Sequence, residues 1–130
     1  MTNEELIKLA KRARLQSYSP YSHFSVGAAL LTWEGEVFTG CNVENASYPA
    51  GCCAERTALF AAAAKGKRKF KKIAVAGSFS DEFASPTIPC GICLQALGEF
   101  CEDDFEIVLC ENDNLIVHKL SEFLPIRFTL

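Results

Sequence analysis

Two short cysteine motifs constrain the fold of this chain more than any other feature: Cys53-Ala54-Glu55 and, further along, Pro89-Cys90-Gly91-Ile92-Cys93. Three thiols suit a zinc ion with an open fourth position, and the carboxylate two residues after the first thiol adds a proton carrier. A fold that uses this site must bring the two motifs together. The combination predicts a catalytic metal centre.

Size and composition predict one soluble domain. The chain has 130 residues, of which 49% are hydrophobic, and no segment rich in proline, glycine or serine divides it. Residues 1–130 are therefore expected to form a single domain. The first residues lack the pattern of a secretory signal, and no apolar run is long enough to cross a bilayer, so we expect a cytoplasmic protein without membrane contact.

The cysteine count and the net charge limit which classes of function the chain can have. Seven cysteines are an odd number, and a cytoplasmic compartment is reducing, so we expect free thiols that are available for metal. A formal net charge of -3 gives a nucleic-acid backbone little attraction. The one basic run, residues 65–72, is expected to be a solvated connection between a helix and a strand. We expect no nucleic-acid partner.

The spacing of apolar residues predicts helices that alternate with strands. Thr2 and Glu5 fit a capping box at the start of an amphipathic helix that stops before Pro20. A hairpin at residues 24–41 follows, then helices at 53–64, 91–101 and 121–124 and strands at 73–76, 105–110 and 115–118. Right-handed crossovers would build a mixed five-stranded sheet with helices on both faces, a three-layer α/β/α sandwich.

Both cysteine motifs fall at predicted helix starts. Cys90 and Cys93 are three residues apart, so both sulfurs project to one side of a first helical turn, a spacing that also fits a redox pair or a structural zinc site. Cys53 begins another helix and can complete a three-thiolate site where two helix N-termini favour negative charge. Cys52 is a candidate fourth ligand, but adjacent residues point in different directions, so we assign it to packing.

The negative charge of three thiolates requires compensation. It would make a metal-bound water a poorer acid than in a histidine site. Arg56, on the same helical turn as Glu55, can hydrogen-bond a cysteine sulfur and withdraw charge from the metal. The alternative is an ordinary surface arginine.

The segments Cys53-Ala54-Glu55-Arg56-Thr57-Ala58 and Pro89-Cys90-Gly91-Ile92-Cys93-Leu94-Gln95 resemble cytidine deaminases of the small homotetrameric type. The resemblance runs nearly end to end and includes Tyr18–Leu30 and Gly40–Tyr48, which line the nucleoside pocket in that family. It implies the cytidine deaminase fold, one Zn²⁺ per chain and a homotetramer whose active sites neighbouring subunits complete. The chain departs from the family at Leu94, where arginine is usual, so more of the charge compensation would fall to Arg56.

The resemblance also implies roles for the residues at matching positions. Asn42 and Glu44 would bind ribose hydroxyls, Phe24 would stack on the pyrimidine, and the backbone of Ala54 would contact the base. The chemistry of Glu44 agrees with this division, because a carboxylate accepts hydrogen bonds from a neutral sugar but repels a 5'-phosphate or a polynucleotide backbone. Without the resemblance, Phe24 would be read as a core residue.

Tyr48 and Phe128 are implied to reach the active site of a neighbouring subunit. The expected reaction is hydrolytic deamination of free cytidine and deoxycytidine in pyrimidine salvage, with Glu55 as the proton carrier and ammonia as the leaving group. Two alternatives stay open: deamination of another free amino-heterocycle such as blasticidin S, and a non-enzymatic zinc module that holds two helices together. The acidic balance disfavours a polynucleotide deaminase.

Overall fold

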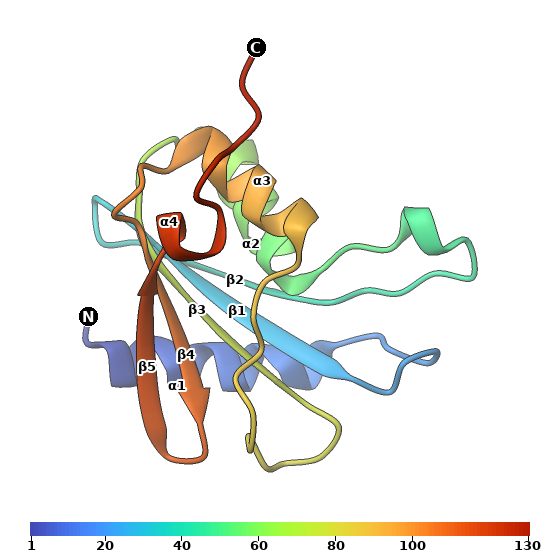
Figure 1. The fold of residues 1–130 in the computed structure, drawn as a ribbon. Helices are drawn as coiled ribbons and strands as arrows, with labels where there is room; N and C mark the ends of the chain where they lie inside the picture. Colours follow the sequence, from blue (N-terminus) through green and yellow to red (C-terminus); the bar gives the residue numbers. More distant parts are fainter.

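The computed structural model describes residues 1–130 and contains one five-stranded sheet (Figure 1). The strand order is β2-β1-β3-β4-β5, and β3 and β4 pair in parallel while the other neighbours are antiparallel. This confirms the predicted hairpin and mixed sheet. The strands are β1 (Ser25–Thr32), β2 (Val37–Cys41), β3 (Phe70–Ser78), β4 (Glu106–Glu111) and β5 (Asn114–Lys119).

Helices cover both faces of the sheet (Figure 1). On one face, α1 (Asn3–Ala13) packs through Leu6, Ile7 and Ala10 against β1, β3 and β4. The other face carries α2 (Ala54–Ala64), α3 (Gly91–Phe100) and α4 (Leu120–Phe123), which share a second apolar cluster with the sheet. The predicted three-layer sandwich is confirmed. Its central strands are almost wholly buried because helices exclude water from both of their faces.

Local signals in the sequence set two helix ends. Thr2 Oγ1 accepts a hydrogen bond from the Glu5 N–H at 3.1 Å, and the Glu5 carboxylate accepts one from the Thr2 N–H at 2.8 Å, which makes the predicted capping box. At the end of α2, Gly66 adopts a φ of 83° and donates its N–H to Ala63 O. This left-handed glycine caps the C-terminal end of α2.

The connections into α2 and α3 carry both cysteine motifs to one side of the sheet. Residues 42–53 leave β2, extend away from the body and include the short 3₁₀ helix η2 (Tyr48–Ala50) before they return to α2 (Figure 1). Residues 79–90 link β3 to α3. We call residues 42–53 the arm. None of the helices combines the length and the apolar composition that crossing a membrane requires.

The N-terminus of α2 rests directly on strand β2 at Gly40. A Cβ atom at this position would lie 2.6 Å from Ala54 O and 2.5 Å from Ala58 N, closer than side chains approach backbone in real structures. Thr57 Oγ1 ties the same helix to the end of β2 through Cys41 O at 2.9 Å. The absence of a side chain at Gly40 therefore determines where the first turn of α2 lies.

Candidate active site

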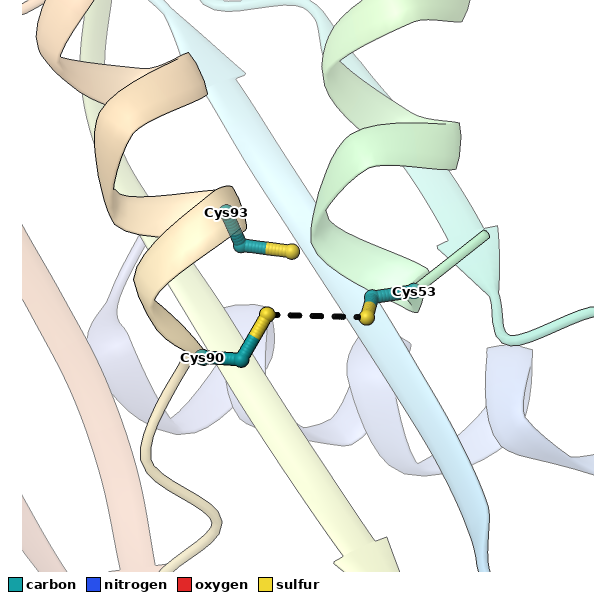
Figure 2. A group of neighbouring side chains, drawn as sticks. All are labelled: Cys53, Cys90 and Cys93. Atoms are coloured by element: carbon teal, nitrogen blue, oxygen red, sulfur yellow. Dashed lines mark hydrogen bonds between the residues drawn. The ribbon is translucent and has the colours of Figure 1, made fainter. Parts of the chain in front are cut away.

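The three predicted zinc ligands meet between the N-termini of α2 and α3 (Figure 2). Their sulfur atoms all lie within 4.8 Å of one another, and the sulfurs of Cys53 and Cys90 are 3.8 Å apart. A tetrahedral zinc ion with bonds of about 2.3 Å separates its sulfur ligands by about 3.8 Å. The donor set and its spacing therefore fit one zinc ion held by Cys53, Cys90 and Cys93.

The fold favours negative charge at this cluster. Cys53 and Cys90 are the N-cap residues of α2 and α3, at the positive ends of the two helix dipoles. A hydrogen bond from the Cys93 thiol, with a second one from Arg56, lowers the pKa of Cys53 to about 5. The same interaction with Cys53 raises the pKa of Cys93 far above its ordinary value, so the two thiols share one tightly bound proton. Zinc binding must release that proton.

Glu55 lies in the first turn of α2, and only 4% of its surface is exposed. Burial, together with the negative charge of Cys53, raises the pKa of its carboxyl group to about 7. A dication held by the thiolates would pull this pKa back down and leave a carboxylate that is ready to accept a proton. A buried acid whose pKa lies near neutrality is the kind of group that general acid-base catalysis uses.

Arg56 contacts the sulfur cluster directly. Its Nη2 donates to Cys53 Sγ at 3.5 Å, and this hydrogen bond raises the pKa of the guanidinium, which stays charged. Its Nε is buried and has no hydrogen-bond partner. The side chain therefore lies where the sequence predicts that a charge-compensating residue should be, although the role itself stays a prediction.

Leu94 and Cys52 lie outside the group of three thiols. Leu94, which stands where the family usually has arginine, is 6% exposed and belongs to the apolar cluster beneath α2 and α3. It therefore supports helix packing and brings no charge to the metal. Cys52 is half-buried and lines a cavity, and it lies outside the group of thiols that could hold a metal ion, so its assignment to packing stays a prediction. Its backbone pairs with Val43 across the arm, which keeps it out of the core.

A cavity of about 440 Å³ opens between the arm and α2, beside the thiol cluster. The predicted sugar-binding residues Asn42 and Glu44 line it together with Tyr48, and Cys53 and Arg56 form its metal end. This volume lies in the range of about 300 to 1,000 Å³ that is usual for small-molecule sites. The cavity thus joins the metal centre to the residues that the sequence assigns to the ribose.

The side chain of Asn42 has one free hydrogen-bonding group. Its Oδ1 accepts from the Val26 N–H at 2.9 Å and from Ser17 Oγ at 2.5 Å, and its Nδ2 donates to Phe24 O at 2.8 Å. An amide oxygen has two lone pairs and an amide nitrogen has two hydrogens. Asn42 can therefore offer a ligand one N–H donor and no acceptor.

Glu44 has the complementary capacity. One of its oxygens accepts from the N–H groups of Tyr21 and Ser22, both at 3.0 Å, and the other accepts from Ser22 Oγ at 2.5 Å. The hydrogen bonds from Ser22 are the main cause that lowers the pKa of this carboxyl group below its ordinary value. One acceptor position is left on the second oxygen. Asn42 and Glu44 therefore present a donor and an acceptor to the cavity, as neighbouring hydroxyl groups require.

Phe24 lies beside this cavity and is not among the residues that line it. It is half-buried, its ring centre is 4.7 Å from that of Phe79, and a Cβ atom at Gly77 would come within 2.9 Å of its ring. The ring is therefore held between β3 and the segment that follows it. Phe79 is a neighbour that sequence reasoning missed, and its position directly after the apolar strand was the available signal.

Tyr48 and Phe128 are open to solvent in the single chain, with 77% and 69% of their surfaces exposed. Tyr48 lies in η2 at the outer part of the arm, and its ring meets that of Tyr21 edge-on at 6.1 Å. Phe128 lies in the C-terminal tail. The cavity walls do include Tyr48 and Tyr21, whereas Phe128 is absent from them.

The fold and the site together define a class: an α/β/α domain with three thiols at zinc spacing at two helix N-termini, beside a buried glutamate and a cavity of small-molecule size. Comparison with known proteins supports this class. The family model described as the cytidine and deoxycytidylate deaminase zinc-binding region matches residues 1–109. This chain belongs to the cytidine deaminase family.

Individual relatives extend the match over the whole chain. The cytidine deaminase of Halalkalibacterium halodurans is 45% identical over 130 residues, which cover 99% of this chain and 96% of the relative. The crystal structure of cytidine deaminase from Burkholderia pseudomallei superposes with a TM-score of 0.90 at 48% identity and covers 98% and 100% of the two chains. The crystal structure of cytidine deaminase from Mycobacterium tuberculosis superposes with a TM-score of 0.85 at 34% identity and covers 100% of this chain and 99% of that chain.

Proposed function

We propose that this chain hydrolyses free cytidine and deoxycytidine to uridine and deoxyuridine with release of ammonia. One observation supports this proposal most strongly. Three thiols at the spacing zinc requires lie together with the buried carboxyl group of Glu55 and a cavity that offers one hydrogen-bond donor and one acceptor to a sugar. Membership of the cytidine deaminase family supports the same reaction. The residue roles below are part of the proposal.

At the sugar end, Asn42 donates its free N–H to one ribose hydroxyl and Glu44 accepts a hydrogen bond from another. Arg56 is the only cation that lines the cavity, and its guanidinium already contacts Cys53. A 5'-phosphate would therefore meet the Glu44 carboxylate with no free cation to offset it. This favours nucleosides over nucleotides and polynucleotides.

At the base end, Cys53, Cys90 and Cys93 would hold a zinc ion, which would activate the water that attacks the ring carbon bearing the amino group. Glu55 takes one proton from this water and delivers it to the ring nitrogen. It then takes the remaining proton of the added hydroxyl group and delivers it to the amino group, so that ammonia leaves as the ring carbonyl forms. The burial of Glu55 limits exchange of that proton with bulk water. Phe24 stacks on the pyrimidine, and the backbone of Ala54 contacts its edge.

We extend the proposal to a cytoplasmic homotetramer in which Tyr48 and Phe128 reach the site of a neighbouring subunit. Both rings are exposed at the ends of projecting segments, where a partner chain can bury them. The tail also exposes Ile126, at 89%. All seven cysteines are free, which fits a reducing compartment.

Replacement of the proton carrier tests the proposal. We expect Glu55→Gln to keep one zinc per chain and to lose at least about a hundredfold in kcat, because general acid-base catalysis contributes about that much or more. Loss of the cytosine absorbance band and release of ammonia measure turnover, and metal analysis measures zinc. Glu4→Gln, an exposed change on α1, is the matched control.

Two results would contradict the proposal. Near-normal turnover by zinc-loaded Glu55→Gln would remove Glu55 from the mechanism. If the unmodified chain turned over blasticidin S but neither cytidine nor deoxycytidine, the substrate assignment would be wrong. Cytidine 5'-monophosphate belongs in the same comparison, and we expect it to react poorly because of Glu44.

A further inference from the structure

The C-terminal tail is fastened along α3, the helix whose first turn carries Cys90 and Cys93. In Figure 1 the tail, in red, crosses α3, in orange. Gln95 and Phe128 exchange two hydrogen bonds, from Gln95 Nε2 to Phe128 O at 3.0 Å and from the Phe128 N–H to Gln95 Oε1 at 3.3 Å. At Gly98 the tail is so close that an added Cβ atom would lie 3.2 Å from Leu124.

The strongest link is made by Arg127 at the C-terminal end of α3. Its Nη1 donates to Gly98 O at 2.9 Å and to Cys101 O at 2.7 Å, and its Nη2 donates to Asp103 Oδ1 at 2.5 Å. The Arg127 side chain is 18% exposed, whereas that of its partner Asp103 is 78% exposed. One guanidinium therefore joins the tail, the last turn of the helix and the turn that follows it.

Without Arg127, α3 has a poorly satisfied end. The C-cap residue Cys101 is extended and does not form a left-handed cap, and the last turn contains no basic residue. Helices leave their final carbonyl groups without partners inside the helix, and the C-terminus carries partial negative charge. Arg127 supplies both the missing donors and the missing positive charge from outside the helix.

The orientation of α3 matters for the metal because its two thiols lie at the other end. A helix of this length is about 15 Å long, so a tilt of about 1° around its C-terminus moves its N-terminus by about 0.3 Å. Ligand distances in zinc sites are held to within about 0.2 Å. The α2 half of the site has its own support, because Gly40 and Thr57 seat the start of that helix on β2.

We propose that Arg127 is a positioning residue for the zinc centre, which holds α3 from its C-terminal end so that Cys90 and Cys93 meet Cys53 at the spacing zinc requires. The inference rests on the zinc centre of the proposed enzyme and is independent of its substrate. It concerns contacts within one chain and adds nothing to the proposed contact of Phe128 with a neighbour.

The test is the affinity for zinc, measured by competition with a chromophoric chelator. We expect Arg127→Gln to weaken binding about tenfold, the lower bound for loss of groups that orient metal ligands. Arg127→Lys, which keeps the charge but not the forked donors, should fall between it and the unmodified protein. Arg12→Gln, an exposed arginine on α1, is the control and should leave the affinity unchanged. The visible spectrum of the cobalt-loaded protein should shift in Arg127→Gln and not in Arg12→Gln.

Zinc affinity of Arg127→Gln within twofold of the unmodified protein would overturn the proposal, even if urea showed a less stable chain. A weaker affinity found only where light scattering shows altered assembly would overturn it too. If Arg127→Gln does not fold, Asp103→Ala removes one acceptor of the guanidinium and should weaken zinc binding about threefold; no change would again overturn it. Cytidine turnover at saturating zinc is recorded separately, because its absence from the unmodified protein would sink the substrate assignment and leave the zinc result standing.

Discussion

The carboxyl group of Glu55 is buried, which destabilises its charged form, yet the proposed catalysis needs that charged form. In the metal-free chain its carboxyl group is surrounded by protein and lies near the Cys53 thiolate, and these surroundings raise its pKa to about 7. Groups at functional sites often destabilise the fold in this way, because their charged form is needed for chemistry and not for packing. Zinc restores the balance by supplying a nearby positive charge.

The cost of burying the Glu55 carboxylate predicts how pH affects the stability of the zinc-free protein. An acid with a raised folded pKa binds its proton more tightly when folded, so its contribution is fully present below the unfolded pKa near 4.5 and is lost as the pH rises through 7. We expect Glu55→Gln, which cannot ionise, to be more stable than the unmodified chain by about 1 to 3 kcal/mol at pH 8 and about equally stable at pH 4. Urea unfolding of reduced, zinc-free protein at the two pH values measures this. Equal stability at pH 8 would show that the carboxylate is well solvated.

At the scale of elements, the site depends on how closely α2 approaches β2. The N-terminal turn of α2 carries Cys53 as its cap and Glu55 inside it, and it is seated over a residue without a side chain. The apolar pattern predicts the helix and its ends. It carries no information on the distance between the helix and the strand, because that distance is set by one glycine and by the hydrogen bond from Thr57 to Cys41 O.

We therefore expect Gly40→Ala to be costly. The added methyl group would meet backbone atoms of Ala54 and Ala58, which cannot move without lifting the helix, so unfolding should cost about 1 to 3 kcal/mol less than in the unmodified chain. Urea unfolding of the zinc-free protein measures the change. Gly91→Ala is the matched control, because a Cβ atom there meets nothing within 4 Å, and it should change stability by less than about 0.5 kcal/mol. Equal stability of the two variants would show that α2 adapts without strain.

At the scale of the whole molecule, the arm and the tail expose aromatic side chains that a partner chain could cover. Tyr48 of the arm and Phe128 of the tail are exposed, while Cys93 of the thiol cluster and Glu55 are buried. Large apolar groups at the ends of projecting segments are typical of surfaces that another protein covers. The proposed tetramer would cover them with copies of the same chain.

Mixing subunits tests this arrangement. Tyr48→Ala and Glu55→Gln should each be nearly inactive alone, whereas the two unfolded, mixed and refolded with zinc should recover measurable turnover. Recovery follows because some sites in a mixed assembly combine Glu55 of one subunit with Tyr48 of another. Light scattering should give about four times the 14.3 kDa of one chain. No recovery from mixtures that do assemble would mean that Tyr48 serves the site of its own chain.

The sequence anticipates the chemistry of this protein well. Hydrophobic periodicity and capping residues are local signals, so the helices, the strands and the sandwich could be predicted. The Cys53 and Cys90–Cys93 motifs likewise carry their chemistry in residue type and spacing. The place of Cys52 beside the cavity could not be predicted in this way, because its pairing with Val43 across the arm depends on a chain reversal that no local pattern specifies.

Residue type and local spacing suffice to predict the elements, the candidate zinc donors and the sign of the charges around them, because these properties reside in single residues and short repeats. Tertiary structure alone decided the spacing of 3.8 Å between sulfurs from two distant helices. It also decided the burial that shifts the pKa of Glu55 and the attachment of Arg127 to the far end of α3. Each of these depends on distances between residues far apart in the chain, and such distances are set only when the core packs.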